Sequence, residues 1–345
     1  MPLTLNQGNN ISHWLSQSTR RGPDRRAWFG REDVRRIADW GFDHIRLPID
    51  EVQMWDEAGK QETEAFDLMD AALDWADETG MSAIVDLHSL RCHSFTRPDD
   101  QRLYTDAAEA AKFADFWRQL SQRLRGRSNT KVAYELMNEP IANDARDWNR
   151  VAMGAYQAIR DAEPHRKIVL GSNRWDSVTT FDQLQVPDDE EILLTFHFYN
   201  PMLITNHRAP WCVEGKMYSG PVQYPGHPVP LECLAELDEP NRSAVAALNQ
   251  AYDRCSMVTD LAKPLAVARR TGLPLYCGEF GVVNLAPQHV RQAWYRDFIS
   301  VLVEHQIGWA NWDYKGDFGI LDSRGQSTGI AEVLLAVAAG EVPKV

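Results

Sequence analysis

Short apolar runs that alternate with amphipathic helical patterns constrain this fold more than any other feature of the sequence. Runs rich in Val, Ile and Leu predict eight strands, at residues 5–11, 44–48, 82–87, 132–137, 168–171, 192–197, 275–278 and 308–312. Helical periodicity fills the intervals, at residues 33–40, 65–79, 107–124, 147–162, 244–270 and 287–305. This alternation predicts a (β/α)8 TIM barrel that occupies residues 1–345 as a single domain.

A doubly wound open sheet is the competing α/β fold. It needs a glycine-rich phosphate-binding turn after an early strand. The only early candidate, Gly8-Asn9-Asn10, lacks the G-x-G-x-x-G spacing. The sequence therefore favours the barrel.

Charge and hydropathy exclude several classes of partner. A net charge of −13 and scattered Lys and Arg argue against a nucleic acid partner. No run approaches the roughly 18 apolar residues that cross a membrane. Residues 1–20 lack the pattern of a secretory signal, so we expect a cytoplasmic protein, or a secreted one if a leader was removed. Nothing in the sequence sets an oligomeric state.

The cysteines form no recognisable framework. Five are present, an odd number, without a C-x-x-C pair. We expect reduced and mostly buried thiols. A Cys212–Cys233 bridge across a long segment is the alternative.

Polar and aromatic side chains gather where the predicted strands end. The active sites of (β/α)8 barrels lie at the C-terminal ends of the strands. The residues found there are Arg46 on strand 2, His88 on strand 3, Asn138 and Glu139 on strand 4, His197 and Tyr199 on strand 6, Glu279 on strand 7 and Trp312 on strand 8. Six strands thus contribute to one predicted site.

Two of these residues, Glu139 and Glu279, suit a retaining glycosidase. That chemistry needs one protonated and one ionised carboxyl group, about 5–5.5 Å apart. Strands 4 and 7 face each other across an eight-stranded ring. Asn138-Glu139-Pro140 could instead be an ordinary helix-capping turn, but the flanking Gly278 and Gly281 suggest that Glu279 faces a ligand.

The neighbouring side chains fit supporting roles. Asn138 can donate to a sugar 2-hydroxyl, Tyr199 can donate to the ionised nucleophile, and Arg46 can hold that carboxylate in its charged form. Each also has a structural alternative: Arg46 as an ion pair at the barrel mouth, and Tyr199 as a core aromatic. His88 and His197 are weaker candidates, and Trp312 could form the floor of a sugar subsite.

With these motifs together, the chain resembles glycoside hydrolase family 5, a cellulase-like family. The segments that carry the resemblance are Ile45-Arg46-Leu47-Pro48, Asp86-Leu87-His88, Asn138-Glu139-Pro140, His197-Phe198-Tyr199, Gly278-Glu279-Phe280-Gly281 and Trp312. The resemblance implies Glu139 as acid/base and Glu279 as nucleophile, with the other strand-end residues around them and no metal or cofactor. It also implies a cis peptide bond after Trp312.

The substrate implied by the resemblance is an oligosaccharide or polysaccharide, with β-1,4-glucan as the default. β-Mannanase, xyloglucanase and exo-acting β-glucosidase activities are alternatives. The unusually long segment 201–240 after strand 6 and the expected cytoplasmic setting favour oligosaccharides or one end of a glucan. We expect this segment to be an ordered wall over the groove, with a decorative surface insertion as the alternative.

Twelve tryptophans exceed what a core of this size requires, and some should line the site. Candidate sugar contacts outside the strand ends are Asn173, Arg174 and Trp175 after strand 5, Trp14 near strand 1, and Trp211.

Two functions from other classes remain as alternatives. A metal-dependent amide or ester hydrolase needs a ligand cluster, often two histidines one apart on strand 1, but that region offers only His13, and H-E-x-x-H is absent. A non-catalytic sugar-binding barrel would be expected to have lost one glutamate, whereas Glu139 and Glu279 are both present.

Overall fold

The strands form a closed parallel barrel in chain order, which confirms the predicted fold class. The computed structural model describes residues 3–341. The strands are β1 (Gln7–Asn10), β2 (His44–Asp50), β3 (Ser82–Ser89), β4 (Val132–Glu135), β5 (Ile168–Gly171), β6 (Ile192–Phe198), β7 (Leu275–Phe280) and β8 (Gly308–Asn311). Every predicted strand is present, with ends that differ by a few residues.

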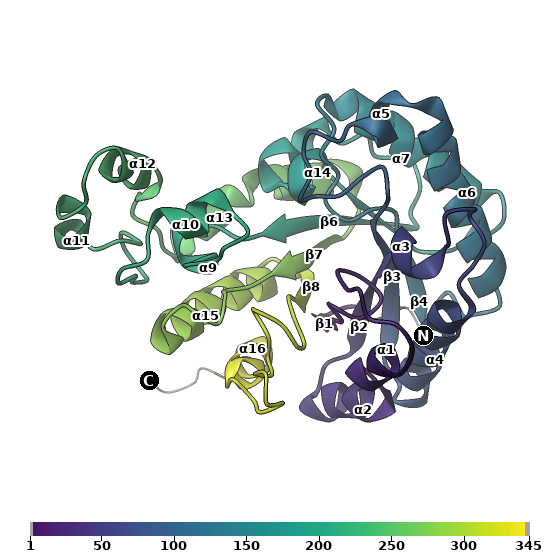
Figure 1. The fold of residues 1–345 in the computed structure, drawn as a ribbon, viewed down its shortest axis with the longest axis horizontal. Coiled ribbons are helices and arrows are strands. Elements are labelled where there is room, and N and C mark those ends of the chain that lie inside the picture. Colours follow the sequence, from purple (N-terminus) through teal and green to yellow (C-terminus); the bar gives the residue numbers. More distant parts are fainter. Residues whose placement is uncertain (1–2, 342–345) are drawn as a thin grey trace. The chain divides into compact units, whose positions relative to one another are not determined.

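Helices follow the strands along the chain (Figure 1). They are α1 (Gly22–Trp28), α2 (Arg31–Trp40), α3 (Glu51–Met54), α4 (Thr63–Glu78), α5 (Arg102–Thr105), α6 (Ala107–Leu124), α7 (Ala145–Arg160), α8 (Asn173–Asp176), the 3-10 helix η1 (Val178–Gln183), α9 (Met202–Thr205), α10 (Val213–Met217), α11 (Leu231–Ala235), α12 (Asn241–Leu248), α13 (Arg254–Asp260), α14 (Ala262–Thr271), α15 (Gln288–Glu304) and α16 (Ile330–Ala338).

The prediction of one helix over 244–270 is wrong, because this region contains α12, α13 and α14. The side chain of Asn249 interrupts the helix by bonding the backbone of Val229, accepting at 2.7 Å and donating at 2.8 Å. Asp253 then starts α13 with a capping box that includes Ser256.

The chain is organised in two compact units. The first comprises residues 3–197, Lys263–Gly278 and Gly308–Ala310, and it holds all of the barrel except the last residues of β6, β7 and β8. The second comprises Phe198–Ala262, Glu279–Ile307 and residues 311–341. The single domain expected for residues 1–345 stays a prediction.

In the first unit, one buried side chain from each of six successive strands fills the barrel. These are Ile84, Ala133, Val169, Leu193, Tyr276 and Ala310. Closure depends on close backbone approach: a Cβ at Gly308 would lie 2.0 Å from the Leu5 carbonyl oxygen. Glycine is therefore needed where the N-terminal segment crosses β8.

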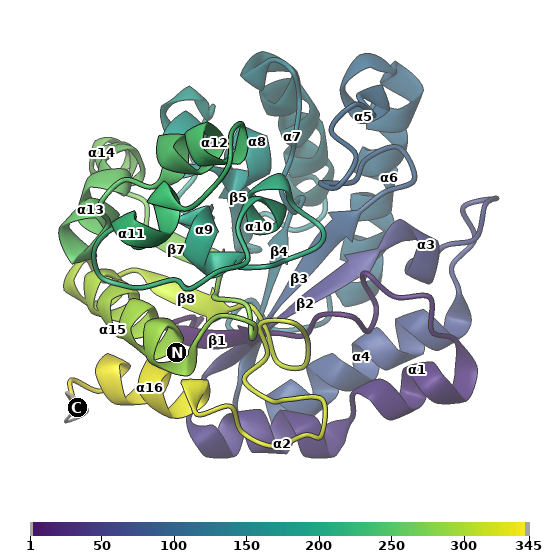
Figure 2. The same cartoon turned by 60° about the vertical axis from the view of Figure 1, so that its left-hand side comes forward.

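In the second unit, the ends of β6 and β7 pack on α15. The Phe198 and Phe298 rings stack with centroids 4.4 Å apart, and Phe280 lies 5.2 Å from Phe298. The long segment after β6 is ordered into short helices (Figure 2) with a small core of its own, formed by Leu203, Tyr218, Val222, Val229 and Val245. The segment is therefore ordered, as expected, and partly helical, whereas its place over a groove stays a prediction.

The cysteines are all free, so the alternative Cys212–Cys233 bridge is wrong. The expectation of mostly buried thiols is also wrong, because only Cys92 and Cys277 are buried. Among the described helices, none combines the length and apolarity required to span a membrane.

A buried ion pair braces the barrel at the N-terminal end of β4. Arg166 is fully buried and bonds Glu163 at 2.6 and 2.9 Å. Its guanidinium also donates to the carbonyl oxygens of Val132 at 2.8 Å and Arg127 at 2.9 Å. Because the chemistry of such barrels lies at the opposite end of the strands, this ion pair contributes to stability.

Arg166→Ala should lower the free energy of unfolding by about 3–5 kcal/mol, because it leaves the Glu163 carboxylate buried without its partner. Urea denaturation measures this. Arg35→Ala is the control, since the Arg35–Glu32 pair is exposed and should contribute less than about 1 kcal/mol. Equal losses in both variants would contradict the assignment.

Candidate active site

A buried arginine organises the site residues of the first unit. The Arg46 guanidinium on β2 bonds Glu135 of β4 through two nitrogens, at 2.6 and 3.0 Å. It also lies 3.1 Å from the Asp86 carboxylate of β3 and donates to the side-chain oxygens of Asn10 and Asn138, each at 2.9 Å. One cation thus connects β1, β2, β3 and β4. The predicted contact between Arg46 and Glu279 stays a prediction.

Burial raises the pKa of both carboxyl groups beside Arg46. Desolvation is the largest effect on Glu135 and on Asp86, and the guanidinium opposes it in each case. Sequence reasoning did not assign Glu135 or Asp86 to the site. The sequence did contain a signal for both residues. Each is an acidic residue in an otherwise mostly apolar strand, and β3 and β4 follow the strand that carries Arg46.

Asn138 is prepared to donate to a ligand. Its Oδ1 accepts from Arg46, which fixes the orientation of the amide. Its Nδ2 is buried and has no hydrogen-bond partner within residues 3–341. A buried donor without a partner is costly, so this geometry agrees with the predicted bond to a sugar hydroxyl.

Glu139 is held at both its backbone and its carboxyl group. Its backbone N–H donates to Asp176 Oδ2 at 2.8 Å, and its Oε1 lies 2.9 Å from Nδ1 of His197. Burial, followed by the charge of Arg46 and then of His88, depresses the pKa of His197 well below its usual range. His197 is therefore a neutral partner of Glu139. The structure thus places this candidate, which was weak in the sequence, in direct contact with Glu139.

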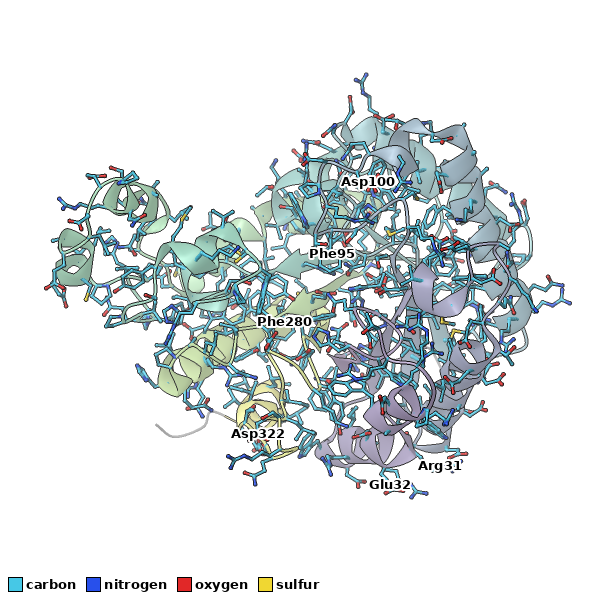
Figure 3. The ribbon with its side chains drawn as sticks, viewed as in Figure 1. Arg31, Glu32, Phe95, Asp100, Phe280 and Asp322 are labelled. Carbon is cyan, nitrogen blue, oxygen red and sulfur yellow. The ribbon has the colours of Figure 1, made fainter. Side chains whose placement is uncertain are left out.

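Asp86 and Phe95 fix the orientation of the His88 ring. Its Nδ1 lies 2.7 Å from Asp86 Oδ2, and its ring meets Phe95 edge-on with centroids 5.3 Å apart. Phe95, labelled in Figure 3, also accepts a hydrogen bond at its carbonyl oxygen from the Trp175 indole at 2.9 Å.

In the second unit, Tyr199 donates its hydroxyl to Glu279 Oε2 at 3.1 Å, as predicted. Thr205 donates to the Tyr199 carbonyl oxygen at 2.5 Å and holds this part of the chain. A hydroxyl donor stabilises the ionised form of a carboxylate. The arrangement therefore suits Glu279 as a nucleophile.

The glycines beside Glu279 make room for the protein itself. A Cβ at Gly278 would lie 2.8 Å from Thr195 Oγ1, and one at Gly281 would lie 2.5 Å from the Trp312 carbonyl oxygen. Packing within the protein therefore explains these glycines, and they do not show that Glu279 faces a ligand. The strand ends around Glu279 pack too closely for side chains at these two positions.

Trp312 is almost fully buried, and the Trp312–Asp313 peptide bond is cis. This confirms what the resemblance implied. The Trp312 N–H donates to the Phe280 carbonyl oxygen at 2.9 Å.

Candidates outside the strand ends separate into exposed and buried residues. Trp14 is fully buried against Phe29, with its indole bonded to the Arg25 carbonyl oxygen at 2.8 Å, so its predicted sugar contact is wrong. Asn173 is buried and donates to the Ala142 carbonyl oxygen at 2.8 Å. Trp175 and Trp211 are 40% and 48% exposed and keep an indole face available.

Glu135, Asp176 and His197 bring possible ligand atoms within 4.8 Å of one another. Glu135 is bonded through both oxygens to Arg46, and Nδ1 of His197 faces Glu139. The guanidinium supplies the positive charge that this cluster needs. The donor set therefore fits an internal ion-pair network better than a metal centre.

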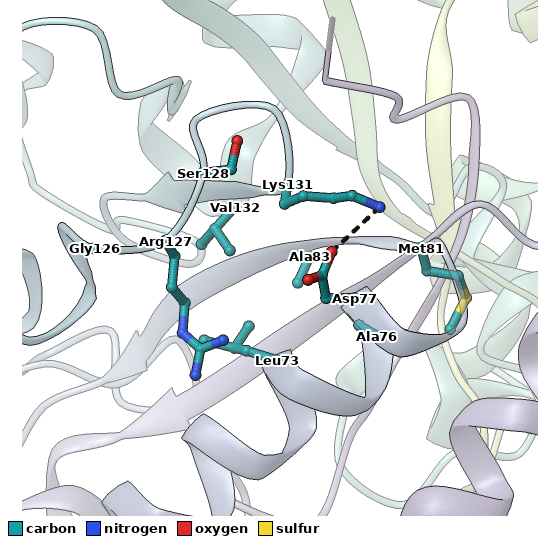
Figure 4. Close-up of a pocket in the computed structure, with 10 residues that line it drawn as sticks. All are labelled: Leu73, Ala76, Asp77, Met81, Ala83, Gly126, Arg127, Ser128, Lys131 and Val132. Atoms are coloured by element: carbon teal, nitrogen blue, oxygen red, sulfur yellow. Dashed lines mark ion pairs between the residues drawn. The ribbon is translucent and has the colours of Figure 1, made fainter. Parts of the chain in front are cut away.

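A pocket of about 250 Å³ lies by the N-terminal ends of β3 and β4 (Figure 4). Its cations are already engaged: Lys131 with Asp77 at 3.5 Å and with the Gly80 carbonyl oxygen at 2.9 Å, and Arg127 with Asp74 at 2.8 Å. Active sites of such barrels occupy the opposite end of the strands. This pocket is therefore not the candidate site.

Comparison with known proteins agrees with the resemblance to glycoside hydrolase family 5 that the sequence motifs indicated. Residues 6–317 match the family described as Cellulase (glycosyl hydrolase family 5). Endoglucanase C of Acetivibrio thermocellus is 30% identical over 317 residues, covering 91% of this chain and 92% of that protein. Cellodextrinase A of Ruminococcus flavefaciens is 25% identical over 304 residues, covering 87% and 83%.

Among solved structures, endoglucanase Cel5A of Thermotoga maritima superimposes with a TM-score of 0.77 at 21% identity, covering 95% of this chain and 96% of its own. At this identity, the likeness shows a shared barrel fold.

Asp176 should give the protein a measurable pH dependence of stability. Burial, followed by the Glu135 carboxylate, raises its pKa well above the usual range. In the unfolded chain an aspartate ionises near about pH 4. Above that pH the folded state retains a proton that the unfolded state has lost, so the free energy of unfolding falls as pH rises.

Asp176→Asn, which cannot ionise, should therefore gain stability relative to wild type as pH rises from about 4 to 7, by up to about 1.4 kcal/mol per pH unit. Urea denaturation across this range measures the difference, with the exposed Asp115→Asn as control. Parallel curves for Asp176→Asn and wild type would show that Asp176 is ionised in the folded protein.

Proposed function

Because the chain belongs to glycosyl hydrolase family 5, we propose that it hydrolyses β-1,4-linked glucans and oligosaccharides by a retaining double displacement. The observation that carries the proposal is the hydrogen bond from Tyr199 to Glu279 at 3.1 Å. This contact suits Glu279 to the role of the attacking carboxylate, while Glu139, which follows β4, lies 2.9 Å from a histidine whose pKa is depressed.

In the first step, a Glu279 oxygen attacks the anomeric carbon as the bond to the leaving oxygen breaks. Glu139 gives its proton to that oxygen, and the glycone remains as an ester on Glu279. In the second step, Glu139 removes a proton from water as the water oxygen attacks the anomeric carbon. Glu279 leaves, and the product keeps the β configuration.

The surrounding residues assist both steps. The unengaged Nδ2 of Asn138 donates to the 2-hydroxyl of the sugar, a bond that strengthens in the transition state. Arg46 orients that amide through Oδ1. The neutral His197 can accept from protonated Glu139, or donate to its ionised form, with a change of tautomer.

Relatives named endoglucanase and cellodextrinase support a glucan substrate, either polymeric or oligomeric. In the second unit, aromatic rings lead outward from Glu279. Tyr199 bonds Glu279, Phe318 lies 5.8 Å from Tyr199, and Trp211 lies 6.0 Å from Phe318. We propose that the exposed Trp211 stacks on a sugar of the glycone side, which favours oligosaccharide substrates. β-Mannanase, xyloglucanase or exo-acting β-glucosidase activity is the alternative.

The class of reaction is tested by Glu279→Gln. Hydrolysis of aryl β-glycosides, β-glucans and β-mannans should fall by at least about 10⁴-fold, because the nucleophile is lost. EDTA should leave wild-type activity unchanged. The exposed Glu236→Gln serves as control. Activity that survives Glu279→Gln but is lost with EDTA would favour the metal-dependent hydrolase instead.

The role of Trp211 is tested by chain length. Trp211→Ala should lower kcat/KM about three- to tenfold on cellotetraose and cellopentaose, consistent with the loss of one aromatic contact. An aryl β-glucoside, which has one sugar, should be unaffected. Leu231→Ala, an exposed apolar residue of the same insertion, is the control. An equal loss on short and long substrates would exclude the stacking role.

A further inference from the structure

We propose that Asp176 is a positioning residue for Glu139, fixing the general acid by a hydrogen bond to its backbone N–H and lying beside the His197 that contacts its carboxyl group. This inference rests on the proposed function. The residue lies outside every motif that identified the site in the sequence.

The backbone of Glu139 adopts a conformation that is unfavourable for a residue other than glycine. Its φ is +48°, in the left-handed region that non-glycine residues seldom occupy. The bond from its N–H to Asp176 Oδ2, at 2.8 Å, satisfies a buried donor in that conformation. Asp176 therefore stabilises the geometry in which Glu139 leaves the end of β4.

The segment that supplies Asp176 is itself strained. Arg174, Trp175 and Asp176 have φ values of +58°, +62° and +49°. Each such residue costs on the order of 1–3 kcal/mol unless the surroundings impose it, and such strain concentrates at functional sites. These three consecutive residues reverse the chain direction, so that the Asp176 carboxyl group reaches the backbone N–H of Glu139.

Contacts between the two strained segments hold them together. The Trp175 N–H donates to the Pro140 carbonyl oxygen at 3.1 Å. The Asn173 amide donates to the Ala142 carbonyl oxygen at 2.8 Å. Asn173 was predicted to contact sugar, but its donor is used here to connect the β5 end to the β4 end.

The end of β5 is shaped to admit the Asp176 carboxyl group. A Cβ at Gly171 would lie 1.8 Å from Asp176 Oδ1 and 2.6 Å from its Cγ. Because φ at Gly171 lies outside the left-handed range, space rather than backbone freedom requires glycine here. Gly171, the strained segment and Glu139 form one arrangement.

His197 lies near both residues. Its Nδ1 is 2.9 Å from Glu139 Oε1, and its Nε2 is 3.8 Å from Asp176 Oδ2. His197 thus lies between the acid and its positioning residue.

Several charged or titratable groups surround this pair. Glu135, Arg46 and Asp86 act on Asp176, and Arg46 and His88 act on His197.

A neutral capping side chain would satisfy the Glu139 N–H without burying an acid. Asp176 is fully buried, and its Oδ1 has no hydrogen-bond partner in the described part of the chain. Such a group costs stability. Its presence is explained if the carboxyl group acts on the His197–Glu139 pair in addition to capping.

The test separates positioning of the acid from general damage by varying the leaving group. For a glycoside with a 2,4-dinitrophenyl leaving group, bond cleavage needs no protonation, whereas cello-oligosaccharides require it. The quantity to compare is kcat/KM, which reports only the first displacement step. Glu139→Ala provides the reference, with a large loss on oligosaccharides and little on the dinitrophenyl glycoside.

Asp176→Ala should lower kcat/KM on cellotetraose by about 10- to 100-fold, a part of the 10²–10⁴ that general acid catalysis supplies. On the dinitrophenyl glycoside the loss should stay under about threefold. Asp176→Asn keeps an acceptor for the Glu139 N–H and should lie between Asp176→Ala and wild type. Gly171→Ala, which displaces the carboxyl group, should reproduce the selective loss independently.

Asp50→Ala is the matched control, because Asp50 is a buried aspartate that bonds Ser89 and the Gln17 backbone rather than Glu139. Any loss in this variant should be equal on the two substrates. If Asp176→Ala and Gly171→Ala also lose activity equally on both substrates, or lose none, the positioning role is overturned. If Glu139→Ala itself shows no selectivity, the proposed function fails, and this inference fails with it.

Discussion

The buried Arg46 guanidinium is the interaction on which the arrangement of the first unit depends. It connects the carboxylates of Glu135 and Asp86 with the amides of Asn10 and Asn138. Asn10 in turn donates to the carbonyl oxygens of Gly278 and Ala310, so the same network reaches β7 and β8. A single cation among several buried acids fixes strand ends that come from distant parts of the chain. Its removal would leave those acids without compensation.

The two ends of the barrel use buried charge differently. At the N-terminal end of β4, Arg166 pairs with Glu163 and with backbone carbonyls, and none of the positive φ values found within residues 3–341 falls at Glu163 or Arg166. At the C-terminal ends, positive φ values occur at Glu139 and from Arg174 to Asp176. Backbone strain thus lies beside the proposed acid rather than beside the structural ion pair.

The sequence predicted the barrel because periodicity and strand composition are local properties, and all eight strands were found. The strand-end residues follow from the same pattern, because the active sites of such barrels lie at the C-terminal ends of the strands, and their joint role stays a prediction. Asp176 could not be predicted, because its role depends on three consecutive left-handed residues and on the space left by Gly171. The predicted sugar contact of Trp14 was wrong for a related reason. The high tryptophan count suggested a sugar-stacking role, but packing against Phe29 buries this side chain. The break at Asn249 likewise depends on a tertiary partner, Val229.

The most direct test of the central claim is to trap the covalent intermediate. The fluorine of a 2-deoxy-2-fluoro β-glucoside slows both displacement steps, but a good leaving group keeps the first step faster than the second, so a retaining enzyme accumulates its ester. Peptide mass spectrometry should then place the label on Glu279, with no label in Glu279→Gln. A label on Glu139, or no label together with release of the α-configured sugar from a natural substrate, would contradict the account.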